Sequence, residues 1–233
     1  MVEPTAHRPI GIFVTGTDTG VGKSLVSAAL LHALSRHLPR VVGMKPIAAG
    51  TEWVNGVLAN DDVLALRAAS TITVPADLDN PVLLDDPVSP HIAAARAGLT
   101  VDVAHIADCY RALAALADAV VVEGAGGFMV PLSLDETGAD LAAALGLPVV
   151  LVVGLRLGCL NHALLTAQAI RAQGLTLAGW VANHVEPTML AQGENIAFLA
   201  ERLRAPLLAT ITFLTDADPR QIEFHLPTDW TAP

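Results

Sequence analysis

The stretch I-G-I-F-V-T-G-T-D-T-G-V-G-K-S-L, residues 10–25, contains an apolar run, a glycine-rich turn and the start of a helical pattern. The run 10–15 predicts a short buried strand, because branched and aromatic residues favour extended backbone. Residues 24–37 then carry apolar side chains at helical spacing, which predicts a helix. A strand, a glycine-rich loop and a helix are therefore expected in this order.

The same alternation continues to residue 211. Branched apolar runs typical of buried parallel strands lie at 40–45, 119–123, 148–153, 177–183 and 206–211. Helical patterns lie at 61–69, 102–117, 139–146, 161–173 and 189–203. Strands that alternate with helices predict an α/β fold, a doubly wound and mostly parallel sheet flanked by helices. We expect residues 1–233 to form a single domain, with the proline-containing segment 70–90 as a surface loop.

The turn G-T-D-T-G-V-G-K-S, residues 16–24, predicts a phosphate-binding loop. Its glycines let backbone amides turn toward one point, and the following helix directs its positive end there. In a P-loop the lysine, here Lys23, reaches the β- and γ-phosphates, and the hydroxyl of Ser24 would be a ligand of Mg²⁺. Five residues, rather than the usual four, separate Gly16 from Gly22. The position between a strand and a helix nevertheless indicates nucleotide binding and a fold of the P-loop NTPase type.

A second acidic ligand is expected in E-G-A-G-G, residues 123–127. Glu123 ends a predicted buried strand, and ligands of open α/β sheets bind at that end of the strands. We interpret it as a Mg²⁺ ligand, the alternative being an acid that merely caps the next turn. Gly124, Gly126 and Gly127 favour the first interpretation, because they let the backbone pass close to a phosphate.

Composition excludes several classes of protein. A hydrophobic fraction of 53% is enough for one packed core, and the formal net charge of −10 would repel nucleic acid and anionic membrane surfaces. The longest uncharged stretch, 141–155, is too short to span a bilayer. The N-terminal residues lack the basic and apolar segments of a signal peptide, so we expect a cytoplasmic protein without nucleic-acid or membrane partners. Cys109 and Cys159 lack metal-ligand spacing and are expected to be core or near-core thiols.

Seven motifs occur in one order along nearly the whole chain. They are G-T-D-T-G-V-G-K-S (16–24), G-M-K-P-I-A-A-G (43–50), D-V-L-A-L (62–66), S-P-H-I (89–92), E-G-A-G-G (123–127), L-G-C-L-N-H-A-L-L-T-A-Q (157–168) and G-W-V-A-N (179–183). Together they resemble the ATP-dependent dethiobiotin synthetases of biotin biosynthesis, P-loop ATPases related to MinD and the nitrogenase iron protein.

The resemblance implies a ligase that converts 7,8-diaminopelargonate, CO₂ and ATP with Mg²⁺ into dethiobiotin, ADP and phosphate. One amine would take up CO₂ as a carbamate, the carbamate would be phosphorylated, and the second amine would close the ureido ring. The carbamate and the transferring phosphoryl group are both anionic, so two ammonium groups and Mg²⁺ would lower their repulsion. The chain contains just two lysines, Lys23 and Lys45, although it uses arginine freely. Arginine-rich codon usage is the alternative explanation of that bias.

Site residues follow from the resemblance. It implies that Lys45, Lys23 and Thr19 are catalytic, and that Asp62, beside Asp61, joins Ser24 and Glu123 in holding Mg²⁺. The implied ATP site consists of Gly20, Val21, Gly22, Lys23, Ser24, Leu25, Asp62, Glu123, Gly124, Ala125, Gly126, Asn183 and His184. Asn183 would hydrogen-bond the adenine, the alternative being an ordinary turn residue.

The implied substrate site consists of Thr19, Lys45, Ala49, Cys159, Leu160 and Asn161. The last three begin a helix, where free amides would hold the substrate carboxylate across the interface of a homodimer. Three positions depart from the family pattern. Ala49 replaces a hydroxyl residue, for which Thr51 is a candidate substitute. Gly20 replaces a glutamate of some members, and Thr212 replaces a proline near the adenine.

Three other functions compete with the synthetase. Another ATP-dependent ligase of the superfamily, such as those that amidate cobyrinic acid, would be expected to carry a glutamine-hydrolysing domain, for which no room is left after Pro233. A MinD- or ParA-like switch ATPase would carry a lysine where this chain has Asp18, and a membrane-binding type would also have a basic amphipathic tail. An iron protein would need paired cysteines at an interface. The sequence favours the synthetase over all three.

Overall fold

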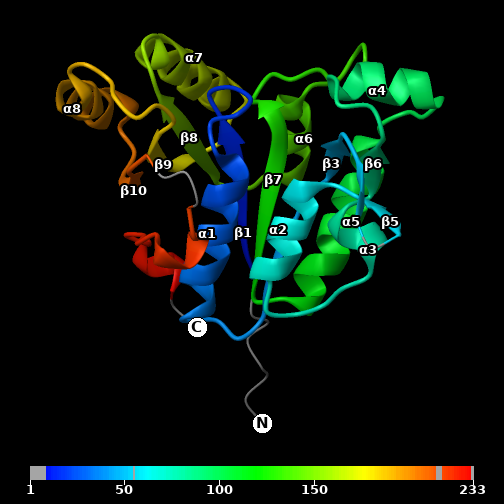
Figure 1. The fold of residues 1–233 in the computed structure, drawn as a ribbon. Helices are drawn as coiled ribbons and strands as arrows, with labels where there is room; N and C mark the ends of the chain where they lie inside the picture. The colour runs from blue at the N-terminus through cyan, green and yellow to red at the C-terminus, as the bar shows by residue number, and fades with distance from the viewer. Residues whose placement is uncertain (1–8, 55, 214–216, 232–233) are drawn as a thin grey trace.

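A central sheet of six parallel strands organises the molecule (Figure 1). The computed structural model describes residues 9–54, 56–213 and 217–231. The strand order is β10-β9-β8-β1-β7-β2. Their bounds are β1 Ile10–Gly16, β2 Val41–Met44, β7 Ala119–Gly127, β8 Val149–Leu155, β9 Leu177–His184 and β10 Leu207–Ile211. All neighbouring strands in this sheet pair in parallel, which confirms the predicted fold class.

Helices cover both faces of this sheet (Figure 1). Those predicted from the sequence are α1 Lys23–Ser35, α2 Asp61–Ala69, α5 Val103–Leu116, α6 Gly138–Leu145, α7 Cys159–Ala172 and α8 Gln192–Leu203. Successive residues of a strand point to opposite faces, so Val14 packs with α1 whereas Phe13 belongs to the cluster that includes Ile106 of α5. This double burial explains why the strands read as continuous apolar runs. Both cysteines are buried and free, as predicted.

The segment 70–90 is more structured than predicted. It contains α3 Ala76–Asp79 and β6 Val82–Leu84, and β6 pairs in parallel with β3 Ile47–Ala49. The prediction of a surface loop was wrong here because the prolines lie at boundaries: Pro75 precedes α3, and Pro90 begins α4 Pro90–Ala97. Leu84 is buried against the core.

Smaller elements complete the described chain. A hairpin joins β4 Glu52–Val54 to β5 Val57–Ala59. Two short 3₁₀ helices, Pro219–Gln221 and Thr228–Trp230, follow β10, and Trp230 is buried in the cluster on the α1 side of the sheet. Within the described residues, no helix has both the length and the apolar character needed to cross a membrane.

Asp140→Ala is expected to lower the free energy of unfolding by about 1 kcal/mol, because it removes a helix cap. The Asp140 carboxylate accepts hydrogen bonds from the Thr137 amide at 2.7 Å and from its hydroxyl at 2.6 Å, at the start of α6. These bonds lower the pKa of Asp140, so the contribution is present at neutral pH and is lost as the pH falls below the ordinary carboxyl pKa. Urea denaturation measures the effect. The exposed Asp135→Ala is the control, and an equal loss in both variants would contradict the cap.

Candidate active site

The predicted phosphate loop connects the end of β1 to the start of α1. Gly20 and Gly22 have φ angles of 72° and 88°, in the left-handed region that glycine adopts without strain. A Cβ atom at Gly22 would also lie 2.3 Å from the side-chain amide nitrogen of Asn183. The loop therefore requires glycine at this position, both for its backbone angle and for the approach of β9.

Strand register brings the predicted charged residues together. Met44 of β2 lies opposite Val122 of β7, so the next residues, Lys45 and Glu123, emerge side by side at the same edge of the sheet. Val14 of β1 lies opposite Glu123, which places the phosphate loop on the other side of this carboxylate. Parallel pairing thus assembles the site from three strand ends.

A cleft of about 600 Å³ opens over these strand ends. Eleven of the predicted site residues line it: Thr19, Gly20, Gly22, Lys23, Ser24, Lys45, Ala49, Asp62, Glu123, Ala125 and Gly126. Residues 87–90, which follow β6 and reach the first residue of α4, also line it. The cleft has the size of a site for a small ligand or cofactor.

Lys45, Asp62, Glu123 and Ser24 form one polar network. The Lys45 ammonium donates to Glu123 Oε1 at 2.5 Å and to Asp62 Oδ2 at 2.6 Å. The Ser24 hydroxyl oxygen lies 2.5 Å from Asp62 Oδ1 and 2.9 Å from Glu123 Oε1. Glu123 is fully buried, and Lys45 is 4% exposed. The alternative that Lys45 is a solvated lysine is therefore wrong, and Asp62 rather than Asp61 is the acid that faces the cleft.

The two lysines differ in their electrostatic environment. Burial disfavours the Lys45 ammonium, but the neighbouring Glu123 and Asp62 outweigh that cost and raise its pKa. Burial, and then the charge of Lys45, lower the pKa of Lys23. Lys45 is thus compensated by carboxylates within the protein, whereas Lys23 is a buried cation whose charge an anionic ligand would stabilise.

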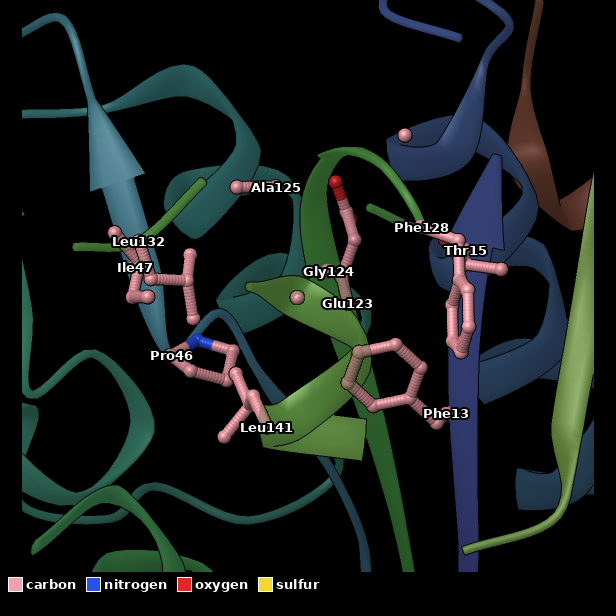
Figure 2. Close-up of a pocket in the computed structure, with 12 residues that line it drawn as sticks. Phe13, Thr15, Pro46, Ile47, Glu123, Gly124, Ala125, Phe128, Leu132 and Leu141 are labelled. Atoms are coloured by element: carbon pink, nitrogen blue, oxygen red, sulfur yellow. The ribbon is translucent and has the colours of Figure 1, made fainter. Parts of the chain in front are cut away.

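Glu123 has one oxygen with no partner in the described part of the chain. Its Oε2 is buried and accepts no hydrogen bond. Glu123 also lines a space of about 10 Å³ together with apolar residues. Figure 2 shows three of them, Phe13, Pro46 and Leu141, near the backbone of Glu123 and Gly124, with the Glu123 side chain extending away from them. This space holds no more than about one water. Burial disfavours the charged carboxylate and raises the pKa of Glu123, although the Lys45 ammonium acts in the opposite direction.

The donor set of this network fits a magnesium ion. Ser24, Asp62 and Glu123 supply hard oxygen ligands, which Mg²⁺ prefers, and Mg²⁺ is usually held by one or two carboxylates together with phosphates and waters. In the described residues, no group of three or more His, Cys, Asp and Glu side chains is arranged to hold a metal by itself. The site therefore suits an ion that arrives with a phosphate ligand.

Other predicted residues support the loop or lie outside the cleft lining. Asn183, at the end of β9, donates its side-chain amide to the Val21 carbonyl at 2.9 Å and so braces the phosphate loop. Gly124 faces the apolar space of Figure 2. The predicted residues that do not line the cleft are Val21, Leu25, Gly124, Cys159, Leu160, Asn161, Asn183 and His184.

The amides at the start of α7 are not all free, contrary to the prediction. The Cys159 amide donates to the Arg156 carbonyl at 3.0 Å, because the chain turns tightly before the helix. Among the described residues, no backbone carbonyl accepts from Leu160 or Asn161. Two amides rather than three are thus available to a ligand.

Thr51 does not replace the hydroxyl that Ala49 lacks. Its hydroxyl donates to Asp85 Oδ1 at 3.0 Å and lines a separate, smaller cleft. Ala49 itself faces the main cleft. Ser89 of the S-P-H-I motif, for which the sequence predicted no role, lines the main cleft. Its side chain makes no cap hydrogen bond at the start of α4.

A family model described as an AAA domain matches residues 10–221. The ATP-dependent dethiobiotin synthetase BioD of Aromatoleum aromaticum is 51% identical over 226 residues, which cover 97% of this chain and 98% of that protein.

Solved structures with the same fold are more distant in sequence. A chain of the MinC:MinD cell division protein complex of Aquifex aeolicus has a TM-score of 0.56 and 15% identity, covering 88% of this chain and 82% of that one. The ParA family ATPase of Chlorobium tepidum has a TM-score of 0.54 and 15% identity, covering 89% and 85%. These two support the fold alone. The match to the synthetase extends over nearly the whole of both sequences, and the chain therefore belongs to the family of ATP-dependent dethiobiotin synthetases.

Proposed function

We propose that this protein forms dethiobiotin from 7,8-diaminopelargonate, CO₂ and ATP. The observation that carries the proposal is the buried Lys45, held by Glu123 and Asp62 beside a phosphate loop that contains Lys23. Two cations in one cleft suit a reaction in which a carbamate and a triphosphate must approach each other. The family membership supports the same reaction.

ATP would bind with its phosphates on the amides of the glycine loop and at the N-terminus of α1. Lys23 would donate to the β- and γ-phosphates. Burial lowers the pKa of Lys23 in the absence of a ligand. Ser24, Asp62 and Glu123 would hold Mg²⁺, which supplies charge neutralisation at the phosphates. Asn183, at the end of β9, would direct its carbonyl oxygen toward the base while its amide stays on Val21.

The diamine would react in three steps. One amine attacks CO₂ and loses a proton to give a carbamate, and a carbamate oxygen then attacks the γ-phosphorus as ADP leaves. The second amine attacks the carbonyl carbon of the mixed anhydride, expels phosphate and loses a proton, which closes the ring. Lys45 would offset the charge of the carbamate, and the Thr19 hydroxyl would hydrogen-bond it.

The substrate carboxylate would bind to the Leu160 and Asn161 amides of a second subunit. These amides lie outside the cleft of their own chain, so one chain alone would leave the carboxylate without this site. Leu157 and Leu165 beside them are 96% and 57% exposed, and a homodimer would cover them. The use of ATP supports a cytoplasmic location, and the single central sheet supports one domain over 1–233.

Leu165→Asp is expected to produce monomers and to raise the KM for the diamine at least tenfold, because a charge at the interface must be desolvated. Sedimentation velocity and steady-state kinetics measure the two effects. Leu190→Asp on a different exposed position is the control. A monomeric wild-type protein with full activity would refute the shared site.

The reaction is tested by phosphate release from ATP and Mg²⁺ with ¹³C-bicarbonate, with and without the diamine. We expect diamine-dependent phosphate together with an equal amount of dethiobiotin that carries the label in its ureido carbon. Phosphate release that does not respond to the diamine would sink the proposal. It would point instead to another substrate of the same cleft.

Asp62→Asn is expected to raise the Mg²⁺ concentration needed for half-maximal activity about tenfold, because a charged ligand becomes neutral. Asp61→Asn is the matched control, since its side chain takes no part in the network around Lys45. Titration of Mg²⁺ at saturating ATP separates the two variants. An identical Mg²⁺ requirement in both would remove Asp62 from the metal site.

A further inference from the structure

Arg156 connects two parts of the site that lie far apart in the sequence. It follows β8 in the turn before α7, and its guanidinium forms an ion pair with the Asp18 carboxylate of the phosphate loop. Arg156 belongs to none of the site residues predicted from the sequence. Asp18 lies in the phosphate loop at the position where a switch ATPase would have a lysine.

Asp18 contacts two of the proposed catalytic residues. Its Oδ1 accepts the Thr19 amide at 2.8 Å, and its backbone carbonyl accepts the Lys23 ammonium at 3.2 Å. The preceding residue, Thr17, is fixed by a hydrogen bond from its amide to the Val152 carbonyl of β8 at 3.0 Å. The position of Asp18 therefore sets where the Thr19 hydroxyl and the Lys23 ammonium are presented.

Arg156 also holds the first turn of α7. Its carbonyl accepts the Cys159 amide at 3.0 Å, directly before the proposed carboxylate-binding amides of Leu160 and Asn161. One residue thus contacts the phosphate loop through its side chain and the start of α7 through its backbone. A shift of either segment would be transmitted to the other through Arg156.

The ion pair is suited to positioning rather than to overall stability. The Arg156 and Asp18 side chains are 38% and 47% exposed, and pairs of this exposure contribute at most about 1 kcal/mol to folding. We propose that Arg156 is a positioning residue that fixes Thr19 and Lys23 through Asp18 and couples the phosphate loop to the first turn of α7. The ligands assigned to the phosphate loop and to the first turn of α7 rest on the proposed function, whereas the coupling of these segments through Arg156 does not.

Steady-state kinetics test the proposal through a variant series. Arg156→Ala is expected to lower kcat about tenfold, because small displacements of catalytic groups carry costs of this size. The dissociation constant of ADP is expected to stay within about twofold, since the loop keeps its sequence and the bound phosphates order its amides again. Arg156→Lys keeps the charge and should restore most of the activity. Arg111→Ala, which breaks an exposed ion pair with Asp108 on α5, is the control.

A double-mutant cycle identifies the partner. Asp18→Asn keeps an acceptor for the Thr19 amide but loses the charge that Arg156 contacts. Arg156→Ala should therefore have little further effect on kcat in the Asp18→Asn background. Additive losses in the double variant would overturn the assignment. A fall in Tm that accounts for the lost activity would do the same, because it would indicate a structural role.

Hydrogen–deuterium exchange tests the connection without any reaction. In Arg156→Ala, peptides that cover 16–24 and 156–162 should both exchange faster, while Arg111→Ala should exchange like wild type. Unchanged exchange in either segment would refute the coupling. If the wild-type protein made no dethiobiotin, the proposed function would fail, and this measurement would still decide the role of Arg156.

Discussion

Lys45→Gln is expected to lower kcat about a thousandfold. A neutral amide has nearly the size of the lysine head group but cannot offset the charge of a carbamate that meets a triphosphate. Single-turnover measurement of dethiobiotin separates this chemical step from binding. The dissociation constant of ADP should change little, because Lys45 directly follows β2 and does not belong to the phosphate loop.

The same substitution is expected to destabilise the protein without ligands by about 3 kcal/mol, because it leaves the buried Glu123 without its cation. Glu123 is fully buried, and Lys45 contacts it at 2.5 Å. The double variant Lys45→Gln with Glu123→Gln removes the unpaired charge, so it should recover most of the stability. It should recover no activity, which distinguishes a catalytic loss from simple unfolding.

Two outcomes would contradict this assignment. Turnover in Lys45→Gln within tenfold of wild type would mean that Lys45 serves the fold alone. Recovery of turnover in the double variant would show that the unpaired carboxylate, rather than the missing ammonium, caused the loss. Urea denaturation of all three proteins provides the stability scale for the comparison.

The fold, the phosphate loop and Glu123 follow from short-range patterns in the sequence, whereas the resemblance to the family pointed to Lys45 and Asp62. Apolar runs give the strands of the central sheet, and a charged residue directly after such a run falls at the carboxyl edge of a parallel sheet. Lys45 and Glu123 both have this position, and the register of β2 and β7 makes them neighbours. The glycines of the phosphate loop mark its place because the left-handed backbone requires them.

Features that depend on pairing between distant segments were not predictable in this way. The strand β6 has only three residues and forms because β3 lies beside it. The contact of Arg156 with Asp18 depends on how β8 lies against β1, and nothing near either residue indicates it. The orientation of the Thr51 hydroxyl toward Asp85 likewise depends on a loop that meets it from another part of the chain.

Lys23→Gln is expected to weaken ATP binding about tenfold to a hundredfold and to lower kcat as well, because charge-assisted hydrogen bonds to phosphate contribute about 1.5–3 kcal/mol. Isothermal titration with ADP and with a non-hydrolysable ATP analogue measures the affinities. The analogue should lose more than ADP, since the ammonium is expected to contact the γ-phosphate. Equal affinity to wild type for both nucleotides would refute the role of Lys23.

The stability of this variant should move in the direction opposite to that of Lys45→Gln. Burial and the neighbouring Lys45 lower the pKa of Lys23, so the folded protein disfavours its charge relative to the unfolded chain. Removing that charge is therefore expected to leave the Tm of the ligand-free protein unchanged or higher, while the rise in Tm caused by ATP becomes smaller. A large loss of stability without ligand would mean that Lys23, like Lys45, is compensated within the protein. In that case, the environments of the two lysines would not support phosphate binding by Lys23 and carbamate activation by Lys45 as separate roles.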